Sequence, residues 1–471
     1  MMTYQSPFSQ RYASDEMRLI WSERARRLTW RRIWVAAADA LASAGLVQRD
    51  QVDDLRGHLE QIDLARAAQI EAEIGHELMA ELKTFAEQAP VGGAILHWGM
   101  TSADVQDNAD VICQRAALIL LINRLKSLLL TFAARIVETA DLAVLGYTHL
   151  QPAEPTSFGY RLAGYAQDLL EHLELLARVR ANLRGKGLRG VVGTAAGFVE
   201  MLAGTSLSAD GLETSVMETL GIRAFPITGQ TYPRSQDYLL LSAMAGLAAS
   251  LHKLAFDMRL MQSPGMSLAS EPFGLQQVGS SALPFKQNPV QAEKVCSLAR
   301  DVAASASVAW QNAANTLLER TLDDSANRRR IIPESFLACD EMLRASATIV
   351  EGLSIDEAGS RGQLEEYAPF TATERLLTAL VKAGAHRQEM HERLRQHSLR
   401  AWEAVRSAKP NPMTDLLTND TSLLRYLQPA RIRELLSPGT YMGLAPARAR
   451  ALAAHIQDRL ATKPHHASAQ G

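Results

Sequence analysis

The chain has 471 residues, of which 49 are basic and 51 acidic, and its formal net charge at pH 7 is −2. This near balance excludes a nucleic-acid surface built on bulk positive charge, although local cationic pockets remain compatible with it. A chain of this length can bury a large core, and it predicts about three domains.

Three cysteines, Cys113, Cys296 and Cys339, are widely spaced in segments of helical character. Because they form no C-x-x-C pair, they predict neither a zinc site nor a disulfide framework. The first residues lack the basic and apolar regions of a signal peptide, and the most apolar stretch, 116–122, is too short to span a bilayer. We therefore expect a soluble, cytoplasmic protein.

Helical periodicity dominates the chain. Residues 1–90 predict shorter helices, and a long helix follows in which apolar side chains recur on one face from Leu118 to Ile136. Further long helices are predicted over 155–185, 240–261, 289–318 and 325–353, the last with Pro333 as an expected kink. The helix over 240–261 has an apolar seam made of Leu240, Met244, Leu247, Leu251, Leu254, Met258 and Met261.

Five long helices with such seams predict an all-α fold built on a central five-helix bundle. We expect three domains: an N-terminal helical domain (1–90), the bundle (91–362) and a C-terminal helical domain (363–471). Breaks are expected at 409–412 and 437–439, and the tail from residue 461 is expected to be disordered. The long helices carry more apolar surface than one bundle buries, which predicts packing against other subunits.

The segment GSSALPFKQNP, from Gly279 to Pro289, predicts a loop that leads into a helix. A hydroxyl group near Lys286 and the amides of a helix N-terminus is a plausible setting for an activated serine oxygen. The alternative is a turn whose small residues only permit tight packing, and the composition of the loop supports both equally.

Two other loops combine reactive side chains. The segment 97–108 offers the hydroxyls of Thr101 and Ser102 ahead of a helix. Ser102 or Asp104 is expected to cap this helix, which does not exclude anion binding by the same amides. The segment 146–157 contains His149 between two long helices, and a lone histidine is more often structural than catalytic.

A further set of polar residues is suited to binding an anion. Arg320, Ser325 and Arg329 surround a predicted helix start, which is a good phosphate site, although an ordinary solvated charge run is the simpler interpretation. Gln230 is an amide donor in the segment 227–235. The remaining candidates are Arg11 and Tyr12 near the start, and His76, which could also be a satisfied core residue.

These segments together resemble the fumarase/aspartase superfamily of lyases, which is marked by a GSSxMPxKxNP loop. Here Leu283 replaces the methionine, a conservative exchange at an apolar position. More narrowly, the chain is similar to the animal-type branch of the adenylosuccinate lyases, through SPFSQRYAS, ITGQTYPRS, LERTLDDSANRR and ATERLLTALVKAGAHRQEMHE. The resemblance fades over roughly the last sixty residues.

The resemblance implies a carbon–nitrogen lyase of purine biosynthesis that eliminates fumarate from adenylosuccinate and from the succinylated imidazole carboxamide ribotide. It implies Ser280 as general base, His149 as general acid, His76 as its support, Lys286 and Asn288 as carboxylate stabilisers, and Glu293 as an orienting group. It implies substrate binding by Arg11, Tyr12, Thr101, Ser102, Gln230, Lys294, Arg320, Ser325 and Arg329. It also implies a homotetramer with active sites shared between subunits and no metal or organic cofactor.

Some positions depart from the pattern of this branch. Gly75 and Gln287 stand where arginines are expected, Glu77 stands for an aspartate, and Lys294 replaces an arginine. Because Arg and Lys differ in geometry at a bidentate site, these exchanges leave the preferred substrate open. Rival interpretations are a lyase acting on a specialised succinylated nucleotide, on argininosuccinate, on fumarate or on a carboxymuconate, and a non-enzymatic relative.

Overall fold

The structure is a computed structural model that describes residues 4–437 and 441–461. Its packing divides the chain into two compact units. Unit 1 comprises residues 1–125, 171–252 and 294–345, and unit 2 comprises residues 126–170, 253–293 and 346–471. This division neither supports nor opposes the three predicted domains, whose borders near 90 and 362 stay a prediction.

Five long helices each contribute residues to both units. They are α6 (Ser102–Glu138), α7 (Phe158–Asn182), α10 (Ser235–Met261), α11 (Val290–Ala314) and α12 (Ser325–Glu351). The predicted apolar seams of α6 and α10 are buried, with every seam residue less than 5% exposed. The predicted all-α class with five long helices is therefore confirmed, and Pro333 lies inside α12 as expected.

Two of these helices, α6 and α10, are long and apolar enough to cross a membrane by length and composition alone. Half of the most apolar window of each is buried inside the chain, as in the core helix of a helical bundle.

Unit 1 also contains shorter helices. Those of the N-terminal region are α1 (Asp15–Ile20), α2 (Glu23–Ser43), α3 (Arg49–Gly57), α4 (Leu64–Ile74) and α5 (Glu77–Gln88), with 3-10 turns at Pro7–Ser9 and Gly93–Ile95, and two more, α8 (Ala196–Leu202) and α9 (Ala209–Thr219), follow α7. Strands β3 (Arg184–Gly185) and β4 (Arg223–Ala224) form a short parallel pair. Trp30, Trp34 and Phe85 share one core with Phe198 and Leu212, so the N-terminal helices pack against a segment distant in sequence.

Unit 2 contains the remaining strands and helices. They are β1 (Ala143–Thr148), β2 (Gln151–Ser157), β5 (Ala269–Ser270), β6 (Ser354–Ile355), α13 (Glu357–Thr371), α14 (Thr373–Lys382), α15 (Arg387–Arg406), α16 (Met413–Thr418), α17 (Pro429–Leu435) and α18 (Ala445–Ala461). Helices α14 to α17 enclose a second apolar core that includes Leu376, Leu380, Met413 and Leu417. The expected break at 409–412 lies between α15 and α16. Most of the expected break at 437–439 and all but the first residue of the expected disordered tail lie outside the described residues.

One local prediction is wrong. The segment 146–157, expected to be a loop, forms most of an antiparallel hairpin in which Thr148 pairs with Gln151 and Ala143 with Ser157. Helix α7 therefore begins at Phe158 rather than near Pro155. The proline residues of this segment are poor strand formers, and pairing with β1 outweighs that local preference.

A buried ion pair fixes the start of α6. The amine of Lys186 lies 2.5 Å from Oδ1 of Asp104, and both side chains are fully buried. The same carboxylate accepts hydrogen bonds from the backbone amides of Arg189 and Gly190, so it joins α6 to the segment that follows β3. Burial lowers the pKa of Lys186, and Asp104 opposes this effect.

We expect Lys186→Met to lower the free energy of unfolding by about 3–5 kcal/mol, because it leaves the Asp104 carboxylate buried without its counter-charge. The matched control is Lys253→Ala, which removes the lysine of an exposed pair with Asp257 and should cost less than about 1 kcal/mol. Urea unfolding at a fixed protein concentration measures both; equal losses would contradict the structural role of the buried pair.

Candidate active site

The predicted site residues divide between the two units. Unit 1 holds Arg11, Tyr12, His76, Thr101, Ser102, Gln230, Lys294, Arg320, Ser325 and Arg329, and unit 2 holds His149, Ser280, Lys286, Asn288 and Glu293. Each group is described within its own unit.

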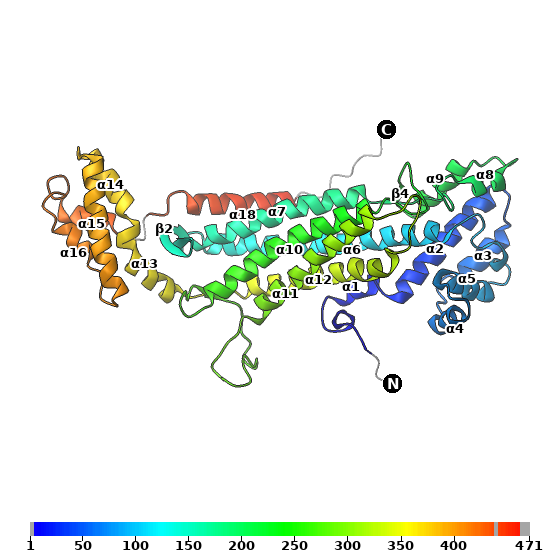
Figure 1. Cartoon of the computed structure of the whole chain (residues 1–471), viewed down its shortest axis with the longest axis horizontal. Helices are drawn as coiled ribbons and strands as arrows, with labels where there is room; N and C mark the ends of the chain where they lie inside the picture. Colours follow the sequence, from blue (N-terminus) through cyan, green and yellow to red (C-terminus); the bar gives the residue numbers. More distant parts are fainter. Residues whose placement is uncertain (1–3, 438–440, 462–471) are drawn as a thin grey trace. The chain divides into compact units, whose positions relative to one another are not determined.

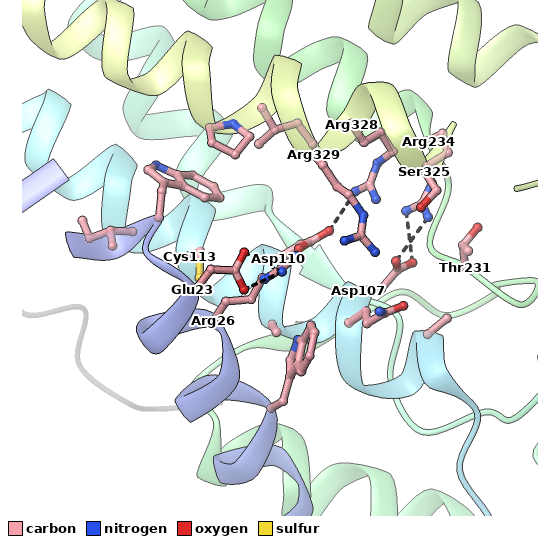
Figure 2. A pocket seen from close by; sticks show the side chains of 18 of the residues that line it. Glu23, Arg26, Asp107, Asp110, Cys113, Thr231, Arg234, Ser325, Arg328 and Arg329 are labelled. Atoms are coloured by element: carbon pink, nitrogen blue, oxygen red, sulfur yellow. Dashed lines mark hydrogen bonds and ion pairs between the residues drawn. The ribbon is translucent and has the colours of Figure 1, made fainter. Parts of the chain in front are cut away.

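A cavity of about 220 Å³ in unit 1 brings together three of the residues predicted to bind phosphate (Figure 2). Arg320, Ser325 and Arg329 line it from the start of α12 and the segment before it. The other polar residues in its wall are Glu23, Arg26, Gln106, Asp107, Asp110, Cys113, Thr231, Arg234 and Arg328. The arrangement joins a helix N-terminus with several guanidinium groups, which is a setting that binds phosphate.

Three consecutive arginines at the start of α12 point in different directions and have different partners. Arg328 is buried and donates to Asp237 at 2.8 Å and to the hydroxyl of Tyr232 at 2.7 Å. Arg329 is about half exposed, and Arg330 pairs with Glu334 at 3.4 Å. The interpretation of this segment as an ordinary solvated charge run therefore fails for Arg328.

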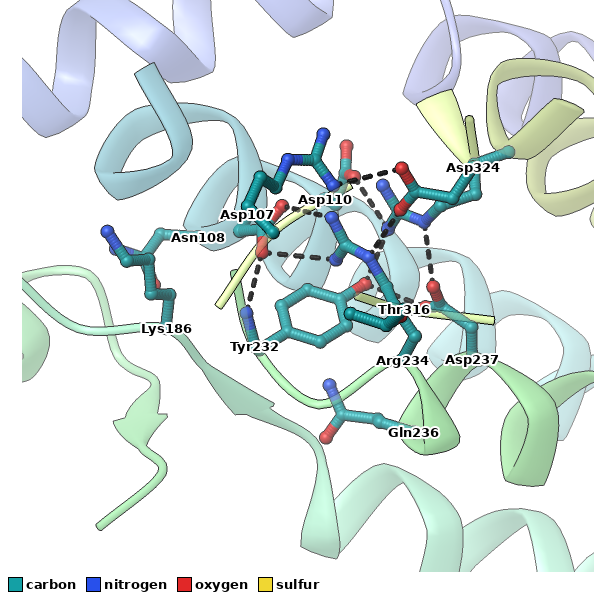
Figure 3. Close-up of polar contacts among 12 residues, drawn as sticks. Asp107, Asn108, Asp110, Lys186, Tyr232, Arg234, Gln236, Asp237, Thr316 and Asp324 are labelled. Carbon is teal, nitrogen blue, oxygen red and sulfur yellow. Dashed lines mark hydrogen bonds and ion pairs between the residues drawn. The ribbon is translucent and has the colours of Figure 1, made fainter. Parts of the chain in front are cut away.

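A network of buried charges includes several residues of the cavity wall (Figure 3). The guanidinium of Arg234 forms ion pairs with Asp107 at 3.1 Å and with Asp324 at 2.7 Å. Tyr232 donates to Asp237 at 2.7 Å, and burial raises the pKa of its hydroxyl well above the usual range. The network connects α6, α10 and the start of α12.

The carboxylate of Glu77 positions Arg329. Its Oε2 lies 2.6 Å from the Arg329 guanidinium, and its Oε1 pairs with Arg26. Burial opposes ionisation of Glu77, but Arg26 and Arg329 outweigh it and lower its pKa.

Gly75 ends α4 with φ of 67°, a left-handed conformation that costs other residues about 1 kcal/mol, so the helix end accounts for this departure from the family pattern.

His76 lies beside a predicted substrate-binding hydroxyl. The histidine is exposed, which excludes its interpretation as a core residue. Its Nδ1 accepts from the amide of Met79 at 3.4 Å, which assigns the proton of the neutral ring to Nε2. That Nε2 lies 3.4 Å from Oγ of Ser102.

The capping role predicted for Ser102 or Asp104 belongs to Asp104, which accepts from the amide of Thr101 at 2.8 Å. Gln230 precedes Thr231, which lines the cavity, and the backbone amide of Gln230 donates to the carbonyl of Glu319 at 3.0 Å. The loop that carries Gln230 is thereby fixed to the segment that carries Arg320.

Lys294 is engaged by an acidic pair on α12. Its amine lies 2.5 Å from Glu341, whose other oxygen accepts from the amide of Ala13 at 3.0 Å. The neighbouring Asp340 accepts from the amide of Ser14 at 2.7 Å. Glu341 and Asp340 thus fix the segment that carries Arg11 and Tyr12, and Lys294 supports this segment through its ion pair with Glu341. A direct contact between Lys294 and substrate stays a prediction.

In unit 2, His149 occupies the tip of the hairpin. His149 and Leu150 have φ of 53° and 59°, so both residues of the turn are left-handed and neither is glycine. Such turns match the twist of antiparallel strands but are strained for these residue types. The His149 ring is exposed, as a group that meets a substrate must be.

The serine loop, residues 271–289, contains no helix or strand (Figure 1). Ser280 accepts from the amide of Leu283 at 3.1 Å, and Asn288 donates to the carbonyl of Gly279 at 2.8 Å. A Cβ atom at Gly279 would lie 2.1 Å from the carbonyl oxygen of Lys286, so only glycine permits this closure. The loop thus holds Ser280 and Lys286 on one closed piece of backbone.

Glu271 begins this loop, and Glu293 follows it in α11. The Glu271 carboxylate accepts from the amides of Gln291 and Ala292 at 3.0 and 2.9 Å and thereby caps α11. Glu293 is exposed in the first turn of α11, and within the described chain it makes no hydrogen bond with His149. Its orienting role stays a prediction.

Sequence reasoning missed several residues of this site. Arg26, Arg234, Asp107 and Asp110 line the cavity without having been predicted. Arg234 lies in the quoted segment ITGQTYPRS, but only the fold reveals that its charge is buried. Among the described residues, no group of three or more His, Cys, Asp or Glu side chains could hold a metal ion.

The fold is shared with known enzymes. A fumarate lyase from Mesorhizobium sp. BNC1 superposes with a TM-score of 0.83 at 23% identity, covering 96% of this chain and all of that one. The 3-carboxy-cis,cis-muconate lactonizing enzyme of Pseudomonas putida gives a TM-score of 0.84 at 24% identity, covering 97% and 99%. At these identities the likeness establishes the fold alone.

Family models define the class. Residues 9–304, more than half of the chain, match the model described as lyase, and residues 369–452 match the model described as adenylosuccinate lyase C-terminus. The first model places the protein among the lyases.

Individual relatives narrow the class. Adenylosuccinate lyase of Saccharomyces cerevisiae is 38% identical over 94% of this chain and 92% of its own, and that of Schistosoma mansoni is 36% identical over 88% of each. The corresponding protein of Archaeoglobus fulgidus is 32% identical over 93% and 96%. The chain therefore belongs to the adenylosuccinate lyase family.

Acid should destabilise the protein through His97, next to the predicted site. Its Nδ1 accepts from the indole N–H of Trp34 at 3.0 Å, and burial lowers its pKa. The folded state binds a proton on His97 more weakly than the unfolded state does. The contribution of neutral His97 to the free energy of unfolding is therefore present above about pH 6.5 and is lost as pH falls.

We expect His97→Asn to flatten this pH dependence, because asparagine keeps an acceptor, cannot be protonated, and tolerates the φ of 63° at this position. The thermal midpoint, measured from about pH 7.5 to about pH 5, should fall less in the variant than in the wild type. Parallel curves for the two proteins would contradict the assignment.

Proposed function

We propose that this protein eliminates fumarate from adenylosuccinate to give AMP, and from the succinylated imidazole carboxamide ribotide to give the free carboxamide. The observation that carries the proposal is the cavity at the start of α12, where Arg320, Ser325 and Arg329 form a phosphate-type site in a chain of this family. Lyases acting on substrates without a phosphate have no use for such a site.

Ser280 and His149 would carry the two proton transfers. Ser280, as an alkoxide, removes a proton from the succinyl carbon next to a carboxylate, and the released electron pair forms the carbon–carbon double bond as the carbon–nitrogen bond breaks. His149 donates a proton to the departing nitrogen. Ser280 accepts two backbone amide hydrogen bonds in its loop, from Ala282 and Leu283, which favours a developing negative charge on its oxygen.

Lys286 and Asn288 would stabilise the negative charge that spreads into the carboxylate during proton removal. Thr101 and Ser102 would bind the other end of the succinyl group, with the imidazole of His76 beside them at 3.4 Å from Ser102. Closure of the serine loop over the substrate would exclude water.

Several apolar residues of this loop are highly exposed, as expected for a surface that closes onto another. They are Leu275, Val278, Leu283 and Phe285.

The tetramer is part of this proposal. Large apolar side chains remain exposed on the long helices, which supports their packing against other copies of the chain. These residues are Ile119, Leu130, Val137, Leu239, Phe256 and Trp310. The exposure of the catalytic loops supports active sites that other subunits complete.

We further propose that the enzyme acts in the cytoplasm without a cofactor.

The direct test is incubation of the purified protein with adenylosuccinate and measurement of fumarate and AMP. We expect equal amounts of both products from the wild type. Ser280→Ala should lose at least about 100-fold in kcat, because it removes the proposed general base. A wild type that folds and yields no fumarate would refute the proposal.

Arg329→Leu should raise KM about 10- to 100-fold with a smaller effect on kcat, because it removes a charge-assisted contact to the phosphate. Arg330→Leu is the matched control, since Arg330 is also exposed but pairs with Glu334 and does not line the cavity. Steady-state kinetics of both variants measure the difference; similar KM values for Arg329→Leu and the wild type would exclude a phosphate site here.

A further inference from the structure

We propose that Tyr147 and Gln363 are positioning residues that hold the His149 hairpin in its active geometry and join it to the stem of the serine loop. The inference rests on the proposed function, since it concerns the general acid of that reaction. All of the residues involved lie in unit 2.

The hairpin requires contacts beyond the hydrogen bonds between its own two strands. Its turn places two non-glycine residues, His149 and Leu150, in the left-handed region, and such strain persists only when the surroundings hold it. The pairing register also shifts between Leu145 and Tyr147, which opposes Pro152, so the end of the hairpin that carries His149 follows an irregularity. Bulges of this kind redirect the end of a strand.

Tyr147 provides a contact next to this tip. It precedes His149 by two residues, and its hydroxyl donates to Oε1 of Gln363 on α13 at 2.6 Å. The contact is partly buried, and burial raises the pKa of the Tyr147 hydroxyl, which keeps it a donor.

Gln363 connects this strand to a second segment. Its Nε2 donates to the carbonyl oxygen of Met266, which follows α10 and lies five residues ahead of the serine loop. The same segment is fixed to the start of α13, because Asp356 caps that helix, accepts from the hydroxyl of Ser267 at 2.9 Å and donates through its amide to Leu268.

The orientation of the Gln363 amide follows from its partners. A backbone carbonyl only accepts, so Nε2 must face Met266 and Oε1 must face Tyr147. Both ends of this amide are therefore used, and a side chain without a donor and an acceptor cannot replace it. One side chain thus connects the hairpin that carries the proposed general acid to the segment that precedes the serine loop.

The test measures the single-turnover rate of fumarate formation, with enzyme in excess over adenylosuccinate, in Tyr147→Phe, Gln363→Leu and the double variant. We expect each single variant to lose about tenfold in this rate, because small misplacements of reacting groups are costly. The double variant should lose no more than either single one, because both changes break the same connection. KM should stay within about twofold, since no contact to substrate is removed.

Tyr441→Phe is the matched control. Its hydroxyl also bonds to the hairpin, at Glu154 on β2, but this contact is exposed and 3.3 Å long. We expect its single-turnover rate to equal that of the wild type. Thermal midpoints of all variants separate a loss of folded protein from a loss of rate, because a purely structural role would lower the midpoint and leave the rate per folded subunit unchanged.

Wild-type rates in Tyr147→Phe or Gln363→Leu, with fumarate formed by the wild type, would overturn this inference alone. A wild type that forms no fumarate would overturn it together with the proposed function. Losses that multiply in the double variant would also count against a shared connection.

Discussion

The candidate site in unit 1 depends on one set of buried charges. Arg234 and Arg328 are held by aspartates from α6, α10 and the start of α12, and the hydroxyl of Tyr232 lies among them. Removing one partner would leave another charge buried without compensation, so the set acts as a unit. Because Arg328 is fixed inward, the roughly 100° step of the helix turns Arg329 toward the cavity, and Ser325 one turn earlier lies beside it. The geometry of the anion site therefore depends on charges that are paired with one another inside the fold.

The long helices were predictable because their signal is repeated many times along the sequence. The seam of α10 contains seven apolar residues at helical spacing, and every one of them is buried. The His149 hairpin was not predictable in the same way. Strand β2 contains two proline residues, and neither strand alternates regularly between apolar and polar side chains. The strands form because β1 and β2 satisfy one another's backbone groups. Pairing between segments is a property of the fold, which the local sequence does not encode.

The residues of the candidate site also divide into those that the sequence could predict and those that it could not. Motif resemblance selected Ser280, His149 and Arg329, because loops with glycine, proline and reactive side chains are distinctive in sequence. It did not select Arg26 or Asp110, whose helices give no sign that these charges face a cavity. It also could not foresee that Lys294 pairs with Glu341, since this contact joins residues far apart in the chain. Burial and pairing of charge are decided by tertiary structure.

The close approach of Gly279 to the carbonyl of Lys286 has a mechanical consequence. With Asn288 bonded across the same point, residues 280–285 form a ring of backbone closed at its neck. Any movement of the neck therefore carries the backbone of Ser280 and of Lys286 together, as parts of one flap. Little conformational entropy is then lost when the flap settles on a ligand, because its internal shape is fixed beforehand.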